Sequence, residues 1–219
     1  MYYLILICSV FVACGKAEEK KLQVVFQYKM DYWNVYDLSG GALTKYHSDG
    51  FLAHELTHVM AGPSFSISLE DGLCQYVQEA IGVTSHLPGM KENGITFEQY
   101  FKTYHEYCKV LAEEEASLKP QDVIDSVGNA GRQYPEGRRM MWMMYSESFV
   151  RYLITQYGVD RTMELITAGE EEAAYEEILG NNLTELKAEW ISSVETLEQQ
   201  YTWEEIERIE LEFMQISNQ

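Results

Sequence analysis

The stretch His54-Glu55-Leu56-Thr57-His58 places two imidazoles four positions apart, with a carboxylate between them. In a helix, residues four apart lie on one face, so both rings can reach a single metal ion. Neutral imidazole is a common ligand of Zn²⁺. Glu55 stands next to the first histidine, where it can take a proton from a metal-bound water. The motif therefore predicts that His54 and His58 bind zinc and that Glu55 is a catalytic base.

The residues after the motif resemble those of gluzincin peptidases, the thermolysin-like MA clan. In that family the next helix commonly reads W-L-x-E-G-x-A-x-Y, and the Glu before the Gly is the third zinc ligand. Leu69, Gly72 and Tyr76 match this pattern, and Cys74 stands for the small Ala. The ligand position falls on Asp71, whose carboxylate is also a competent zinc ligand.

The sequence leaves open three interpretations of the start of this helix. Asp71 is the favoured third ligand, because Gly72, Tyr76 and the apolar face set the register of the helix. Glu70 would bind instead if the helix were rotated by about 100°. Alternatively, Ser68 to Asp71 resembles a capping box, in which Asp71 only caps the helix. The family's Trp is replaced by Ser68.

Two later segments continue the resemblance, which covers about residues 50–197. Tyr145 to Gly158 resembles the family's Y-x-x-x-x-F-V-x-Y-L helix followed by Y-G, and residues 179–190 resemble its closing Gly, S/T-x-x-E-L and Trp pattern. The resemblance implies zinc-dependent hydrolysis of a peptide bond in a peptide or protein substrate. A donor that stabilises the oxyanion is also expected; Tyr145 is the first candidate and His105 the second.

Charge and composition narrow the class of partner. The chain has 219 residues, is 46% hydrophobic and carries a formal net charge of −19. Nucleic acid is excluded as an expected partner, because phosphate binding requires a basic face.

The N-terminus has the pattern of an export signal. Residues 2–13 are apolar and uncharged, but they are fewer than the roughly 20 apolar residues of a membrane-spanning helix. We expect a signal peptide over residues 1–13. Cys14 follows small residues, as in a bacterial lipobox, so we expect it to be lipidated and to anchor the protein at the extracytoplasmic face of the cell membrane, with plain secretion as the alternative. Residues 14–21 then form a tether.

Only Cys74 and Cys108 remain for the folded domain. They can form one disulfide in an oxidising compartment or remain two buried thiols, and the sequence leaves both open.

The remaining pattern predicts an α+β, mostly helical, zincin-like fold. A small N-terminal β-sheet is expected to pack on the motif helix, which ends at Gly62-Pro63, and a helical subdomain follows. The zincin-like domain is expected over 22–199, with a C-terminal helix in 200–219. Expected strands cover 22–28, 34–38 and 42–46, and expected helices cover 69–81, 97–115, 120–127, 138–157, 160–168, 171–179, 183–199 and 202–216.

Two rival functions remain beside the peptidase. One is an exported, zincin-fold binding protein with weak or no catalytic activity, which the Asp71 and Ser68 departures favour. The other is an interaction protein of packed helices that binds no metal.

Overall fold

The structure of the chain is a computed structural model. In the strands, at Pro88 and over 214–217 it describes the backbone alone. The described residues are 3–10, 20–27, 32–37, 43–46, 53–54, 57–58, 60–62, 64–81, 88–115, 118–130, 138–168 and 172–217.

The chain divides into two compact units. The first comprises Met1–Pro63 and Val77–Ser85, and the second comprises Ser64–Tyr76 and His86–Gln219. Helix α2 (Ile67–Ala80) contributes residues to both units.

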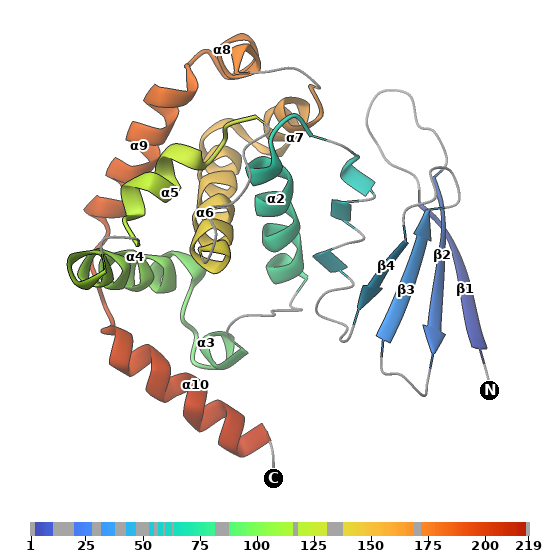
Figure 1. The fold of residues 1–219 in the computed structure, drawn as a ribbon, viewed down its shortest axis with the longest axis horizontal. Helices are drawn as coiled ribbons and strands as arrows, with labels where there is room; N and C mark the ends of the chain where they lie inside the picture. Colours follow the sequence, from blue (N-terminus) through green and yellow to red (C-terminus); the bar gives the residue numbers. More distant parts are fainter. Residues whose placement is uncertain are drawn as a thin grey trace. The chain divides into compact units, whose positions relative to one another are not determined.

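The first unit contains an antiparallel sheet whose strands follow one another in chain order (Figure 1). Each strand pairs with the next, for example Leu4 with Phe26 and Val24 with Val35. The strands are β1 (Tyr3–Val10), β2 (Lys20–Gln27), β3 (Tyr32–Asp37) and β4 (Leu43–Tyr46).

The predicted α+β fold, with a sheet packed on the motif helix, is wrong. The structure describes side chains for only part of the chain. Of the residues described with their side chains, 79% lie in helices and none lies in a strand. The second unit, which holds most of the chain, has no strand among its described residues. Its helices cover one another's apolar faces, so its core needs no sheet.

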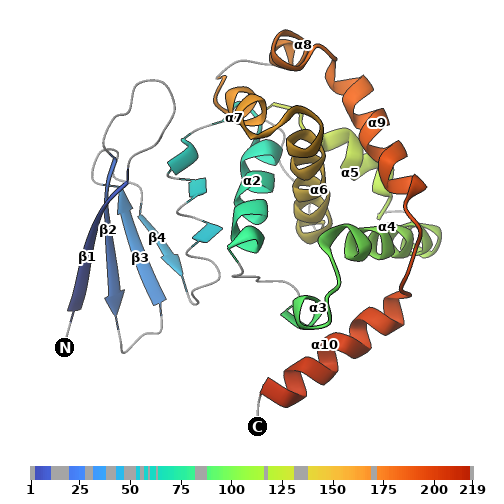
Figure 2. The ribbon, with the colours of Figure 1, turned by 180° about the vertical axis from the view of Figure 1, so that it is seen from behind.

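Helix α6 is the central element of the second unit (Figures 1 and 2). Every residue from Met141 to Val150 is buried, as is Leu153. A helix that is buried all round must have neighbours on every side, and α6 packs against α4, α5, α7 and α9. The helices of this unit besides α2 are α3 (Pro88–Glu92), α4 (Phe97–Glu114), α5 (Pro120–Ser126), α6 (Arg139–Tyr157), α7 (Val159–Thr167), α8 (Ala173–Leu179), α9 (Leu183–Thr196) and α10 (Trp203–Ser217).

Local signals account for several of these boundaries. The sequence predicts a cap at Thr96, and Thr96 begins α4 in a capping box with Gln99. Gly180 ends α8 in the left-handed conformation, with φ 84°, which glycine adopts without steric cost.

Helix α3 is one element that the sequence prediction misses. Pro88-Gly89 reads as a loop, yet it starts a short helix that packs against α10. Glu210 of α10 accepts a hydrogen bond from the Met90 backbone N–H at 3.2 Å. A carboxylate at that end satisfies a backbone donor that has no partner within the helix.

Helices α2 and α6 approach each other closely at Gly72. A Cβ added there would lie 2.4 Å from the Ser146 carbonyl oxygen and 2.8 Å from Val150 Cγ2. Because the nearest atom belongs to backbone, a side chain cannot be accommodated without moving a helix. Glycine at position 72 is therefore a packing requirement of this helix pair.

We expect Gly72→Ala to lower the free energy of unfolding by about 2 kcal/mol, because the added methyl overpacks the α2–α6 contact. Urea unfolding followed by circular dichroism measures the change. Gly180→Asn is the matched control: position 180 is open to solvent, and Asn tolerates the left-handed conformation. Equal stability of Gly72→Ala and wild type would contradict the close approach.

Candidate metal centre

The motif residues that the structure describes are helical. Ala53, His54, Thr57 and His58 are assigned to helix, and the Thr57 hydroxyl donates to the Ala53 carbonyl at 2.8 Å, one turn back. The Gly62 backbone N–H donates to the His58 carbonyl at 3.1 Å. Gly62 then has φ 79°, consistent with the helix end that the sequence predicts there.

The two histidine rings converge from this helical segment. Nε2 of His54 and Nε2 of His58 lie 3.2 Å apart, and the ring centroids are 4.9 Å apart. A tetrahedral zinc bound at 2.0–2.1 Å by two imidazoles requires ligand nitrogens about 3.3 Å apart. The observed pair therefore fits two adjacent positions of such an ion. His54 is buried and His58 is half-buried.

Glu55, the predicted catalytic base, lies outside the described residues. Cys14, the predicted lipidation site, lies outside them as well.

Helix α2 carries the predicted third ligand. Asp71 is buried, with 6% of its surface exposed, whereas the neighbouring Glu70 is half-buried. A buried carboxylate must be compensated by a metal, a cation or hydrogen bonds, so its burial favours Asp71 over Glu70 as a ligand. Asp71 belongs to the second unit and the two histidines belong to the first.

The capping-box interpretation of Asp71 is wrong. Helix α2 begins before Ser68, and the Ser66 hydroxyl accepts a hydrogen bond from the Leu69 backbone N–H at 3.4 Å. Ser68 lies inside the helix, and its hydroxyl accepts from the Gly128 backbone N–H. Ser66 therefore takes the capping position.

Cys74 and Cys108 are both buried, and no disulfide joins them. Burial raises the pKa of the Cys108 thiol to about 12. That thiol therefore stays protonated at neutral pH and is a poor nucleophile.

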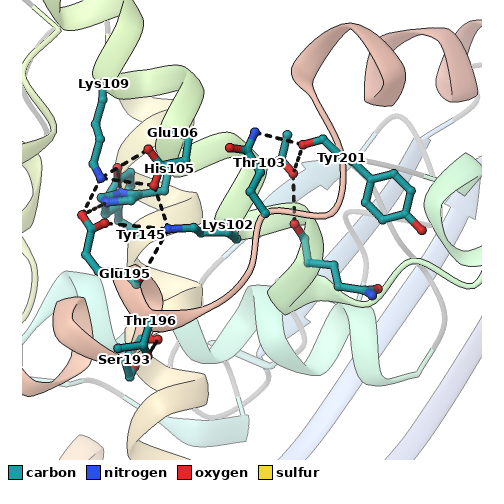
Figure 3. Close-up of polar contacts among 12 residues, drawn as sticks. Lys102, Thr103, His105, Glu106, Lys109, Tyr145, Ser193, Glu195, Thr196 and Tyr201 are labelled. Carbon is teal, nitrogen blue, oxygen red and sulfur yellow. Dashed lines mark hydrogen bonds and ion pairs between the residues drawn. The ribbon is translucent and has the colours of Figure 1, made fainter.

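The two candidate oxyanion donors contact each other inside the second unit (Figure 3). The Tyr145 hydroxyl of α6 lies 2.6 Å from Nδ1 of His105 on α4. Tyr145 is fully buried and His105 is 2% exposed. Nε2 of His105 lies 3.0 Å from a carboxylate oxygen of Glu195 on α9.

Four charged side chains surround the outer end of this chain of contacts (Figure 3). Lys109 Nζ lies 2.5 Å from Glu195 and 3.2 Å from Glu106. Lys102 Nζ lies 2.7 Å from Glu106 and 3.7 Å from Glu195. Two cations and two anions thus alternate, and their formal charges cancel.

The pKa values of these groups determine which atom donates in each hydrogen bond between Tyr145, His105 and Glu195. The hydrogen bond from Lys109, aided by His105, holds the pKa of Glu195 at about 2, so this carboxylate only accepts hydrogen bonds. His105 Nε2 must therefore donate to Glu195, and in the neutral ring Nδ1 accepts from the Tyr145 hydroxyl. Burial raises the pKa of Tyr145 far above its ordinary value, so that hydroxyl keeps its proton.

His105, Glu106 and Glu195 also form a set of donor atoms close enough to hold a metal ion. Both carboxylates, however, already bind the ammonium groups of Lys102 and Lys109. In the structure this cluster is therefore an ion-pair network. The residues of this network on α4 are spaced so that they share one face of that helix. No sequence pattern, however, indicates that Glu195 lies beside them.

A mainly apolar pocket lies between α4, α6 and α9. The Arg151 guanidinium stands at its edge, 4.2 Å from the Phe97 ring centroid. Arg151 bonds the Glu147 carboxylate at 3.1 Å, and Glu98 lies 3.8 Å away. The guanidinium of Arg151 thus already contacts two carboxyl groups.

Comparison of the chain with protein-family models, curated proteins and solved structures gives no match. Among the described residues, no helix combines the length and apolar character that crossing a membrane requires.

Removing the buried hydroxyl tests the hydrogen-bonded chain. We expect Tyr145→Phe to lower the free energy of unfolding by about 1–3 kcal/mol, because His105 Nδ1 loses its donor in a buried site. Urea unfolding at pH 7 measures this. The control is Tyr157→Phe, whose half-buried hydroxyl accepts from Asn181 at 3.2 Å and can be replaced by water. A Tyr145→Phe cost no larger than the control's would refute the contact.

Proposed function

We propose that the protein is a zinc-dependent peptidase, exported and held at the membrane through lipidated Cys14. The observation that carries the proposal is the convergence of the His54 and His58 Nε2 atoms at 3.2 Å, which fits two ligands of a tetrahedral zinc. The H-E-x-x-H pattern and the resemblance to gluzincin peptidases supply the reaction class.

Asp71 is the proposed third protein ligand. Its place before Gly72 and its burial support this role. When bound, zinc would lower the pKa of a coordinated water and polarise the carbonyl of the scissile peptide bond.

Glu55 is the proposed general base. Its carboxylate takes the proton of the attacking water and passes it to the leaving amine, so that one side chain serves both proton transfers. Tyr145 has no oxyanion role in this mechanism, because its buried hydroxyl already donates to His105.

We expect the purified chain to bind one zinc ion, and each of His54→Ala, His58→Ala and Asp71→Ala to weaken binding by more than about 100-fold. Loss of a residue that hydrogen-bonds a metal ligand already lowers metal affinity 10–100-fold, so loss of the ligand itself must lower the affinity further. Competition with a chromophoric chelator measures the affinity. Glu70→Ala is the matched control and should keep wild-type affinity. No stoichiometric zinc in wild type would favour the metal-free interaction protein, and the reverse result for Asp71 and Glu70 would move the third ligand to Glu70.

Hydrolysis of a mixed peptide library tests the base. We expect Glu55→Gln to lose about 100-fold or more in rate, since general acid–base catalysis contributes 10²–10⁴-fold, and to retain zinc. Glu98→Gln, an exposed carboxylate on α4, is the control and should be active. Zinc binding without hydrolysis by wild type would instead support the zincin-fold binding protein with little or no activity.

A further inference from the structure

The contacts of His105 join three helices at one point of the second unit. His105 comes from α4, Tyr145 from α6 and Glu195 from α9. Glu195 lies near the end of α9, just before the connection to α10. This junction is therefore one of the contacts that hold the connection against α4.

Further contacts attach the same connection to α4. The Lys102 ammonium donates to the Glu195 carbonyl at 3.3 Å, and the Thr103 hydroxyl donates to the Tyr201 carbonyl at 3.0 Å. Figure 3 shows these contacts beside the His105 cluster. The segment from Glu195 to Tyr201 is therefore fastened to one face of α4.

Protonation of His105 is incompatible with the closed junction. A proton on Nδ1 would turn that nitrogen into a donor, facing a hydroxyl that now donates to it. The Tyr145 proton would then need another acceptor. Tyr145 contacts the Phe101 and Trp190 rings. The Cys108 thiol and the Tyr104 hydroxyl lie nearby, but these two groups already hydrogen-bond each other.

The surrounding charges also oppose the protonation of His105. From α4, Lys102 and Lys109 face the site with Glu106, and from α9 Glu195 faces it. These four charges cancel, and α6 contributes the neutral Tyr145. A protonated His105 would leave one net positive charge at a ring that is 2% exposed, which is costly in a site of low polarity.

We propose that the His105–Tyr145–Glu195 junction is an acid-sensitive latch, in which protonation of His105 releases the α9–α10 connection, residues 197–202, from α4. The device belongs to the helical unit and does not depend on the zinc site.

Linkage sets the direction and size of the response. Burial lowers the pKa of His105 below its ordinary value of 6.5, against the opposing effect of the hydrogen bond to Glu195. Below pH 6.5 the released histidine takes up a proton that the closed junction excludes. The opening equilibrium therefore rises by up to tenfold for each pH unit of acidification, until the pKa of the closed state is reached.

Hydrogen exchange of the full chain, corrected for intrinsic rates, tests the latch. Opening in segments 99–110 and 190–203 should rise by up to about 16-fold between pH 6.5 and 5.0, with EDTA present or absent. The reference segment is α7, which contains no histidine and should change less. In His105→Gln the amide can still donate to Glu195 and accept from Tyr145 but cannot titrate, so the rise should vanish. Opening in wild type that is independent of pH, or an unchanged rise in His105→Gln, would overturn the proposal.

A second measurement keeps the test decisive if His105→Gln does not fold. Nitrogen NMR of wild type should show His105 as the Nε2–H tautomer at pH 7, with a pKa below 6.5. An Nδ1–H tautomer or a pKa above 6.5 would overturn the latch, whatever the fate of the peptidase proposal.

Discussion

Burial of α6 on all sides is the constraint on which the helical unit depends. From Met141 to Val150 its side chains leave no face for water, so α4, α5, α7 and α9 must each supply a complementary surface. Large rings fill most of that space: Trp142, Tyr145 and Phe149 are at most 1% exposed. Where the approach is closest, α2 contributes Gly72 instead of a side chain.

Two of the polar groups buried with α6 have specific partners on neighbouring helices. The Trp190 indole N–H donates to the Ser148 hydroxyl at 3.0 Å, and the Tyr145 hydroxyl bonds His105. Each such bond contributes little net stability but is costly to leave unmade. They therefore select one mutual arrangement of α4, α6 and α9 out of the many that apolar packing alone would allow.

Helices were predictable where local physics sets their limits. The apolar periodicity and the Thr96 cap located α4, and Gly180 marked the end of α8. The prediction failed where distant contacts decide: Pro88-Gly89 starts a helix that packs against α10 and is capped by Glu210. Ser68 has the spacing of a cap, but its hydroxyl serves Gly128, 60 positions away. The expectation of a sheet packed on the motif helix was wrong for a similar reason. An apolar run in a sequence does not specify which element it packs against.

The sequence by itself determined the pairing of His54 with His58, because one helical turn brings residues four apart onto the same face whatever surrounds them. It also supplied the carboxylates from which the third ligand and the base are proposed. Only the tertiary structure decided that His105, Tyr145 and Glu195 meet. They lie on three helices, and their meeting depends on how those helices pack around α6, which no local pattern records.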